Sequence, residues 1–378
     1  SGNNYGRATS VAALALKARM LLYAASPLMN KAGVDPLVGY PSPDPARWQK
    51  VADADKAVID LATQNGYKLY DASPGDIKQR YTDMFLDKQN PEVLFSRQNY
   101  GNTNNSEYID QANGPNGYDQ WGGNTPTQEF VDAFDMADGS KFSWSNPAMA
   151  AHPYANRDPR LSAFVLVDGD LWKGRPVETH FNEVTAGVFR GGLDTKDGGS
   201  PWNTSKTGYN MRKFLNPEYV TNSWVFTGKS AQNWVWLRLA EFYLDYSEAQ
   251  YNLANEAEAK SATYGINKIR ARAGMPVVTE SGTALWDRIV NERRIELSFE
   301  EHRFFDIRRW MIADVVMNQP ATGVIVKKYL NGTFEYKAHA GTETLTEDRK
   351  FVASKMYWLP IPQGERDKNP NLKQNPGY

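Results

Sequence analysis

The stretch Asn291–Trp310, NERRIELSFEEHRFFDIRRW, places three glutamates four residues apart, at Glu292, Glu296 and Glu300. If one helix continues through them, their carboxylates lie on one face and repel one another by roughly 0.2–0.5 kcal/mol per pair. Guanidinium groups packed between helices can satisfy several such carboxylates at once. The nearest candidates by sequence are the arginines of the same segment and of the segment before it: Arg293, Arg294, Arg270 and Arg272.

The same stretch also holds the ingredients of acid–base catalysis, because His302 stands beside Glu300 and Glu301. HExxH spacing is absent, however, and this is the pattern by which a histidine–glutamate pair on a helix signals a metal site. The remaining histidines lie in unrelated segments, at His152, His180 and His339. We therefore favour an ion network that serves the fold, an interpretation that unpaired glutamates in an open cleft would contradict.

Helical periodicity surrounds this stretch on both sides. Asp44 and Pro45 form an N-cap followed by proline at the first helical position, while Ser26-Pro27 ends the helix before them. The predicted helices are 8–25, 45–65, 234–254, 256–273 and 283–298, and the segment 299–314 either continues the last helix or begins another. Alanine-rich contacts indicate tetratricopeptide-like hairpins, although no clean 34-residue repeat is present. We therefore expect a mainly α fold.

Between residues 67 and 230 the pattern changes to repeated clusters of Gly, Asn, Asp and Pro. We predict a large irregular loop-rich region here, with short strands at Val93–Phe95 and Ala163–Val167 and a short helix at Pro126–Met136. The chain then divides into a first helical part (1–66), a loop-rich ligand-binding region (67–230) and a second helical part (231–378).

The last 22 residues, from Tyr357 to Tyr378, have no helical or strand period, and their prolines favour an extended tail. We expect apolar side chains at the start of the tail to pin it across the helices: Tyr357, Trp358, Leu359 and Ile361.

Composition excludes several classes of protein. With 43 basic and 44 acidic residues and no block of like charge, the chain lacks the basic footprint of a nucleic-acid-binding protein. Cysteine is absent, which excludes disulfides and thiolate metal sites. The early apolar run VAALALKARMLLYAASPLM is interrupted by Lys17 and Arg19 and falls short of the about 18 uncharged residues of a membrane span.

Seven ordered motifs resemble the SusD/RagB family and run through nearly the whole chain. They are GRATSVAALALKARMLLYAASPLMN (6–30), PTQEFVDAFDMADG (126–139), NRDPRL (156–161), WVWLRLAEFYLDYSEAQ (234–250), INKIRARAGMP (266–276), NERRIELSFEEHRFFDIRRW (291–310) and YWLPIPQGERDKNPNLKQNPGY (357–378).

The resemblance implies a non-enzymatic outer-membrane lipoprotein of Bacteroidetes, lipidated at an N-terminal cysteine, that binds glycan or another nutrient above a SusC-type TonB-dependent transporter. It also implies a scaffold of tetratricopeptide-like helices that carries a variable, loop-rich binding face. The chain departs from the family at its front, where the lipobox, its cysteine and the first helical region are missing. We therefore expect a truncated mature protein, attached to the membrane only through a lipid anchor absent from this chain.

Aromatic residues in the irregular middle suit sugar binding, because a pyranose ring stacks its CH face on a flat aromatic platform flanked by polar partners. Loops concentrate binding residues. The candidate ligand-binding residues come from two glycine-bearing loops: Tyr118, Asp119, Trp121 and Asn124 from the first, and Phe189, Arg190, Trp202 and Tyr209 from the second. Packing of these loops on the scaffold, or contact with the transporter, is the alternative for Trp121 and Trp202.

Seven further tryptophans are expected to be structural. We predict Trp172 to be an anchor, and helical or tail positions place the others in the core. These others are Trp48, Trp234, Trp236, Trp286, Trp310 and Trp358.

We therefore predict non-catalytic oligosaccharide binding at the outer membrane and delivery to the transporter, without cofactor, metal or nucleic acid. Calcium stays undecided, because no EF-hand spacing appears. The rivals are a peptide-binding or purely transporter-facing subunit and, with less support, a glycoside hydrolase, which needs two facing carboxylates. Loop carboxylates that could supply such a pair are Asp168, Asp170, Glu178 and Asp194.

Overall fold

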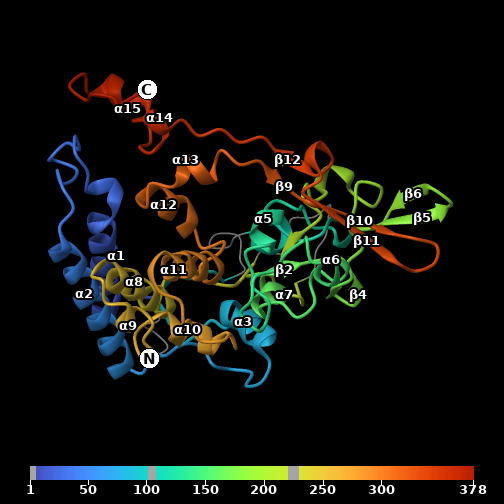
Figure 1. Ribbon diagram of the computed structural model, residues 1–378, viewed down its shortest axis with the longest axis horizontal. Coiled ribbons are helices and arrows are strands. Elements are labelled where there is room, and N and C mark those ends of the chain that lie inside the picture. Colours follow the sequence, from blue (N-terminus) through green and yellow to red (C-terminus); the bar gives the residue numbers. More distant parts are fainter. Residues whose placement is uncertain (1–5, 101–107, 220–229) are drawn as a thin grey trace.

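The computed structural model describes residues 6–100, 108–219 and 230–378. The longer helices gather in one part of the molecule, and most of the strands gather in the other, together with the short helices α5, α6 and α7 of residues 128–164 (Figure 1). The helical part contains α1 (Ser10–Ala25), α2 (Pro45–Gln64) and α8 (Leu239–Asn252), which share one core. The described residues include no helix of the length and apolarity needed to cross a membrane.

The first two helices begin and end as their sequence predicts. The side chain of Thr9 accepts a hydrogen bond from the amide of Ala12, and that of Asp44 accepts one from Ala46. Both acceptors satisfy amide groups that have no partner within the helix. Ala15 and Ala18 are fully buried, and their small side chains allow the neighbouring helices to lie close together. The predictions of helices at 8–25 and 45–65 are therefore confirmed to within two residues.

The second helical part is more broken than its periodicity predicts. The predicted helix 234–254 is wrong at its start, because residues 234–238 form the strand β8 (Trp234–Arg238) before α8 begins. The predicted helix 256–273 is two helices, α9 (Glu256–Ala259) and α10 (Ile266–Arg272), separated at Gly265, where a β-carbon would clash with carbonyl oxygens of the preceding turn.

The glutamate-bearing segment Asn291–Trp310 also divides between two helices. α11 (Gly282–Glu296) ends before Leu297, and α12 (His302–Arg309) begins after a turn. Phe299 and Glu301 in that turn have left-handed backbones, with φ of 61° and 66°. Residues with side chains adopt this conformation at a cost, so a helix cannot continue through the turn. Glu300 therefore lies beyond the helix that holds Glu292 and Glu296.

Strands are short and form several small sheets. β1 (Val93–Arg97), predicted as 93–95, pairs antiparallel with β8. The largest sheet has four strands in the order β11 (Phe334–Ala338), β10 (Val324–Lys328), β5 (Phe181–Thr185) and β6 (Val188–Gly191), and it projects at the end of the molecule farthest from α1 and α2 (Figure 1).

Two predictions in the middle region are only partly correct. The predicted strand Ala163–Val167 begins inside the helix α7 (Arg160–Phe164), and only β2 (Val165–Leu166) is a strand, paired with β7 (Asn210–Met211). The predicted helix Pro126–Met136 is a single turn, α5 (Gln128–Val131), capped by Thr127. The other short elements are η2 (Pro27–Met29), α3 (Ile77–Leu86), α4 (Ile109–Ala112), η3 (Asn116–Tyr118), α6 (Pro147–Ala151), β3 (Leu171–Trp172), β4 (Arg175–Pro176), η4 (Pro201–Asn203), α13 (Ala313–Val316), β9 (Ala321–Thr322), η5 (Gly341–Glu343) and β12 (Leu345–Glu347).

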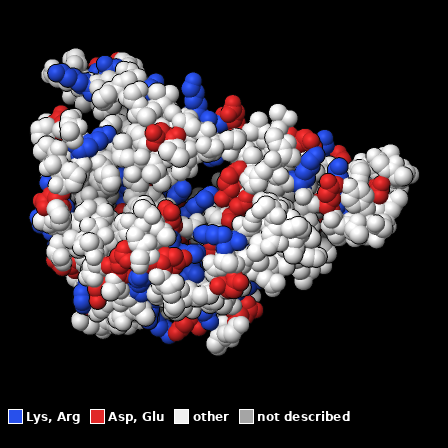
Figure 2. All heavy atoms as spheres, in the orientation of Figure 1, with Lys and Arg blue, Asp and Glu red and all other residues white. Residues whose placement is uncertain are grey.

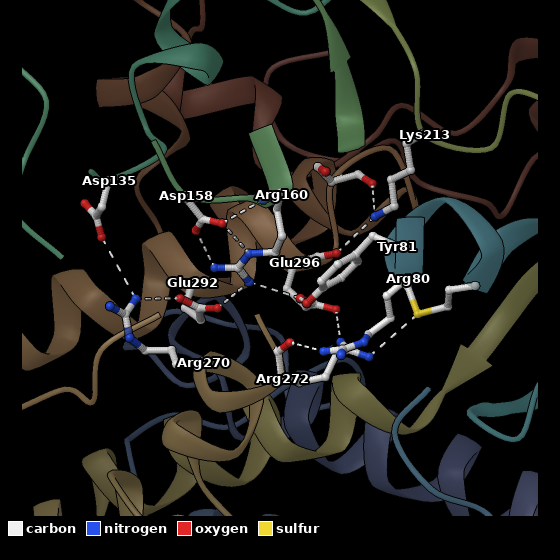
Figure 3. Close-up of polar contacts among 12 residues, drawn as sticks. Arg80, Tyr81, Asp135, Asp158, Arg160, Lys213, Arg270, Arg272, Glu292 and Glu296 are labelled. Carbon is white, nitrogen blue, oxygen red and sulfur yellow. Dashed lines mark hydrogen bonds and ion pairs between the residues drawn. The ribbon is translucent and has the colours of Figure 1, made fainter. Parts of the chain in front are cut away.

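A buried ion cluster joins the helical scaffold to the loop-rich region (Figure 3). Glu296 on α11 accepts hydrogen bonds from Arg160 at 3.0 Å and Arg238 at 2.8 Å, and it also pairs with Arg272. The phenol of Tyr81 donates to the same carboxylate at 2.8 Å. We name this set the glutamate cluster; its acidic members are Glu92, Asp158, Glu292, Glu296 and Glu300, and its basic members are Arg160, Lys213, Arg238, Arg270 and Arg272.

The glutamate cluster confirms that these carboxylates serve the fold, since all are buried and paired. The expected partners were correct for Arg270 and Arg272 only. Arg293 instead pairs with Asp245 and Asp306, and Arg294 donates to the carbonyl of Glu129. The other basic partners of the three glutamates come from segments distant in the sequence: they are Arg160, Lys213 and Arg238.

A second buried network ties α8 to α12. Arg309 donates to Glu248 at 2.7 Å and to Asp306 at 2.8 Å, and the indole of Trp310 donates to Glu248 at 2.8 Å. His302 lies beside Arg293, with 3.4 Å between Nδ1 and Nη2. Burial lowers the pKa of His302 to about 4, and the positive charge of Arg293 lowers it as well. The nearby carboxylates Glu241 and Asp306 raise this pKa, but their effect is smaller than the other two together. His302 is thus a neutral core residue.

The C-terminal tail follows a less extended path than predicted, because the short helix α15 (Gln363–Lys368) interrupts it. Another short helix, α14 (Ala353–Met356), ends directly before the tail. Tyr357 does pin the tail: it is buried and its phenol donates to Asp314 at 2.5 Å. Leu359 does not, since 55% of its side chain is exposed.

Candidate ligand-binding site

A pocket of about 470 Å³ opens where the loop-rich region meets the β1–β8 pair. Its lining combines aromatic rings with a cation, amides and a carboxylate. The lining residues are Arg97, Tyr108, Ile109, Ala112, Asn113, Asn124, Trp234, Trp236 and Glu301. We call it the aromatic pocket.

The strand β8 supplies two of its rings. Trp234 and Trp236 are two residues apart and therefore point to the same side of the strand. Trp234 is half-buried and packs on Phe214, with 5.6 Å between ring centroids, whereas 47% of Trp236 is exposed. Arg97 pairs with Trp234 across the two strands. The prediction of a core position is therefore wrong for Trp236, although Trp48 and Trp310 are buried as expected.

A loop clamped by Asn113 forms the opposite wall. The side-chain oxygen of Asn113 accepts hydrogen bonds from the backbone and side-chain amides of Asn124, at 3.0 and 2.8 Å. Tyr108 stacks with Trp121, with 6.4 Å between centroids and 26° between planes. Gly123 runs against the carbonyl of Ala112, where a β-carbon would lie 2.6 Å from the oxygen. The loop therefore holds its shape through backbone contacts that leave no room for a larger residue.

Asp110 fixes the base of this loop from inside. Its carboxylate accepts hydrogen bonds from the amide of Asn216 at 2.6 Å, from Ser230 at 2.7 Å and from Gln232 at 2.8 Å. Burial raises the pKa of Asp110, and these donors oppose the rise by stabilising the charged form. The loop of residues 108–124 is thus tied to the segment that leads into β8, so both walls of the pocket are held in register.

Glu301 is the only carboxylate that contributes to the lining among the described residues. Its left-handed backbone, at φ of 66°, lies in the turn between α11 and α12. Non-glycine residues in this conformation gather at functional sites, where the surrounding structure holds the strain. Glu301 is exposed and can accept hydrogen bonds from a bound ligand.

The carboxylates considered for hydrolysis lie elsewhere and hold turns. Asp168 accepts the backbone amides of Thr179 and His180, both at 2.9 Å, and Asp194 pairs with Arg175 at 2.8 Å. A glycosidase needs two carboxyl groups facing one sugar, about 5 to 10 Å apart. The lining of the aromatic pocket, with Glu301 alone, does not provide that pair. No group of three or more histidine, aspartate or glutamate residues in the described part of the chain is placed to hold a metal ion.

The first predicted loop comes partly to this pocket. Asn124 lines it directly, and Trp121 reaches it through its stack with Tyr108. Tyr118 turns away: the guanidinium of Arg175 lies 3.7 Å above its ring, and its phenol donates to the carbonyl of Arg175 at 2.8 Å. Asp119 is exposed at a left-handed position beside it.

The second predicted loop is dispersed. Trp202 lies on η4 and is 75% exposed. The next residue, Asn203, packs closely on the first loop: a β-carbon at Gly122 would lie only 2.5 Å from the carbonyl oxygen of Asn203. Phe189 and Arg190 lie on β6 in the projecting sheet, apart from the pocket (Figure 1).

The prediction that Tyr209 contacts a ligand is wrong. It is fully buried and donates to Gln128 at 2.7 Å, so it has no surface to offer a ligand. The expected anchor Trp172 is confirmed, since it is buried and donates to Gln120 at 3.3 Å.

Charge is distributed evenly over the face that Figure 2 shows. Acidic and basic side chains are interspersed, and both signs line the hollow between the helical part and the part that bears the projecting sheet (Figure 2). A nucleic-acid-binding surface would concentrate one sign.

Comparison with known proteins identifies the family to which this fold belongs. The model of the SusD family matches residues 91–378, which is more than half of the chain. The chain belongs to the SusD family. The SusD-like protein P2 of Formosa agariphila is 29% identical over 160 residues, which make up 40% of this chain and 27% of that protein. The matched part of this SusD-family chain thus spans about a quarter of the length of that curated relative.

Solved structures agree with the assignment. A SusD-like protein from Bacteroides fragilis superposes with a TM-score of 0.76 at 29% identity, over 100% of this chain and 67% of the other. A SusD-like carbohydrate-binding protein from the same species has a TM-score of 0.73 at 23% identity, over 99% of this chain and 66% of its own. The predicted mainly helical, SusD-like fold with small sheets is therefore confirmed.

Proposed function

We propose that this SusD-family chain binds an oligosaccharide in the aromatic pocket without chemical change to it. The observation that carries the proposal is the half-exposed ring of Trp236 in a pocket that also presents Arg97, Asn124 and Glu301. The volume of about 470 Å³ falls within the range of about 300 to 1,000 Å³ typical of small-molecule sites. The B. fragilis protein of similar fold is itself described as carbohydrate-binding, which supports the same ligand class here.

The chemistry of the lining suits a sugar. The faces of Trp234 and Trp236 can stack on the CH face of a pyranose, in contacts worth about 1 kcal/mol per ring. Amide, guanidinium and carboxylate groups around the rings can pair with hydroxyl groups. A hydroxyl in the wrong orientation would leave one of these groups unpaired, which costs about 1–3 kcal/mol and gives selectivity.

We further propose that the chain acts at the outer-membrane surface and passes its ligand to a SusC-type TonB-dependent transporter. The family assignment supports this role, and the candidates that lie outside the aromatic pocket are available for it. The exposure of Trp202 and the position of Phe189 and Arg190 on β6 support a contact of these residues with the transporter or with a longer ligand. A peptide could use the same rings, and a screen of ligands distinguishes the two cases.

Replacing Trp236 with alanine is expected to weaken glycan binding by about five- to tenfold, because it removes a stacking platform worth about 1 kcal/mol from the pocket. Calorimetric titration against a panel of oligosaccharides measures the effect, and chromatography of the same samples checks that no sugar is cleaved. Trp121→Ala should weaken binding less, because Trp121 acts through Tyr108.

The matched control is Phe334→Ala, which removes a ring of similar exposure, 42%, from the projecting sheet. It should bind as the native chain does. Trp202→Ala reports whether the site extends to the second loop. Unchanged affinity in Trp236→Ala would reject the aromatic pocket as the glycan site, and binding of peptides alone would reject the ligand class.

A further inference from the structure

A second pocket is lined by residues of α12, the end of α1, η2 and the C-terminal tail. Its volume is about 350 Å³, and it shares no lining residue with the aromatic pocket. Five aromatic side chains contribute to its lining: Tyr23, Phe304, Phe305, Tyr357 and Trp358. Leu28, Met29, Leu359, Asn375, Arg308 and Arg309 complete it. We call it the tail pocket.

The rings of the tail pocket are arranged for another ring. Tyr23 and Phe305 are nearly parallel, with 28° between planes and 6.3 Å between centroids, while Phe304 meets Phe305 edge-on at 5.2 Å. Phe304 and Phe305 are 43% and 46% exposed although both lie on a helix whose other face is buried. Adjacent exposed aromatic rings at a concave site indicate an apolar ligand.

The two arginines of the pocket differ in their partners. Arg309 is held by Glu248 and Asp306. Arg308 makes no ion pair with a carboxylate in the described part of the chain; its Nη1 donates to the carbonyl of Phe304 at 2.9 Å, and its Nε is shielded from solvent without an acceptor. Its guanidinium lies 3.6 Å above the ring of Phe304. An arginine held in this way is complementary to a carboxylate, which its planar fork can bind through two hydrogen bonds.

The tail forms a firm wall for this pocket. The phenol of Tyr378 donates to the carbonyl of Trp358 at 3.0 Å, and the side chain of Asn375 donates to that of Leu359 at 2.7 Å. Gln374 accepts the amide of Ile361 at 2.8 Å and donates to its carbonyl at 2.9 Å. The two ends of the tail thus hold each other, and the wall is present before any ligand arrives.

We propose that the tail pocket binds a small aromatic carboxylate, with its ring against Tyr23 and Phe305 and its carboxylate on Arg308. The rings specify a flat apolar body, and the unpaired guanidinium specifies one negative charge at its edge. This site is separate from the glycan site, so the two proposals stand or fall independently.

Titration of the full chain with 4-hydroxycinnamate and with its neutral amide tests the site. The acid should bind saturably, and the amide should bind at least about tenfold more weakly because a charge-assisted pair is lost. A tyrosine-terminated tripeptide offers the same ring and carboxylate from a polypeptide end. Tighter binding of the tripeptide, or equal binding of acid and amide, would overturn the assignment.

Variants locate the site. Arg308→Met should weaken binding of the acid about tenfold and leave the weak binding of the amide unchanged, whereas Phe305→Ala should weaken both. Arg308→Lys keeps the charge but loses the fork, so its affinity should lie between those of Arg308→Met and the native chain. This conservative variant also guards against a loss of binding that arises only because a variant fails to fold.

Two controls complete the test. Lys268→Met removes an exposed cation from α10, outside both pockets, and should bind the acid normally. Trp236→Ala should also bind the acid normally, since the two pockets share no residue. Absence of saturable binding to the folded native chain at millimolar acid would overturn the proposal, as would unchanged affinity in Arg308→Met.

Discussion

Glu296→Gln is expected to lower the free energy of unfolding by about 3–5 kcal/mol, the usual cost of breaking a buried ion pair by removing one partner. The carboxylate is fully buried and pairs with Arg160, Arg238 and Arg272. Glutamine keeps the shape but removes the charge, so the three guanidinium groups would share a deficit of negative charge within the core. Urea unfolding followed by tryptophan fluorescence measures the change.

The control for this prediction is Glu365→Gln, which removes a carboxylate from an exposed pair with Lys368. Exposed pairs contribute about 0–1 kcal/mol, so this variant should unfold nearly as the native chain does. A loss of less than about 1 kcal/mol in Glu296→Gln would show that the glutamate cluster does not stabilise the fold through its ion pairs.

The pH dependence has a definite sign. Burial would raise the pKa of Glu300, but Arg238 and Lys213 outweigh it and hold the pKa at about 2; the pKa of Glu296 is lowered further by its three guanidinium partners against the same burial. Carboxylates with lowered pKa values stabilise the folded state above their ordinary range near 4.5 and lose this contribution as the pH falls toward 2. The native chain should therefore lose more stability on acidification than Glu296→Gln.

Local patterns predicted most helix ends and the structural role of the charged stretch. They could not predict which cations pair with the glutamates, because Arg160 and Arg238 are brought to Glu296 from 136 and 58 residues away. The strand β8 was predicted as the start of the helix 234–254. Trp234–Arg238 has only five residues, most of them apolar, so their hydrophobic pattern does not distinguish a strand from a helix. The alternation of Trp234 and Trp236 was the signal that could have revealed it.

This error displaced the predicted binding site. A helix through residues 234–238 places Trp236 in the core, which leaves only the loop tryptophans as candidates for ligand contact. The pocket is formed by residues from four separated segments, including Arg97, Tyr108 and Glu301. Of the predicted binding residues, only Asn124 lines it, and Trp121 adjoins it through Tyr108; ligand contact by either stays a prediction. Convergence of this kind depends on tertiary packing and leaves no trace in residue spacing.

Asp55 presents the opposite case to Glu296, a buried carboxylate without a cation. It lies on the face of α2 that packs on α8, it is fully buried, and neither of its oxygens has a hydrogen-bond partner in the described structure. Asp245 on α8 pairs with Arg293 through one oxygen, while its other oxygen also lacks a partner among the described residues. Burial raises the pKa of Asp55 well above its ordinary value, and the charge of Asp245 raises it further. The two carboxylates therefore each disfavour the charged form of the other.

Asp55→Asn is therefore expected to stabilise the protein at neutral pH, by up to roughly 1–4 kcal/mol, the gain found when buried ion pairs are replaced by uncharged residues of similar volume. A raised pKa in the folded state gives stability that is fully present below the ordinary carboxyl pKa of 3.8 and is lost as the pH rises. Asparagine needs no proton to stay neutral, so its advantage should grow from about pH 4.5 to about pH 7.5.

Urea unfolding at these two pH values measures the difference, with Asp53→Asn as the matched control. Asp53 lies on the same helix but is exposed and accepts a hydrogen bond from Gln49 at 2.8 Å, so its replacement should change stability by less than about 0.5 kcal/mol at either pH. If Asp55→Asn instead destabilised the protein equally at both pH values, Asp55 would have to be ionised in the folded state. The core between α2 and α8 would then have to stabilise that charge without a direct ion pair to it.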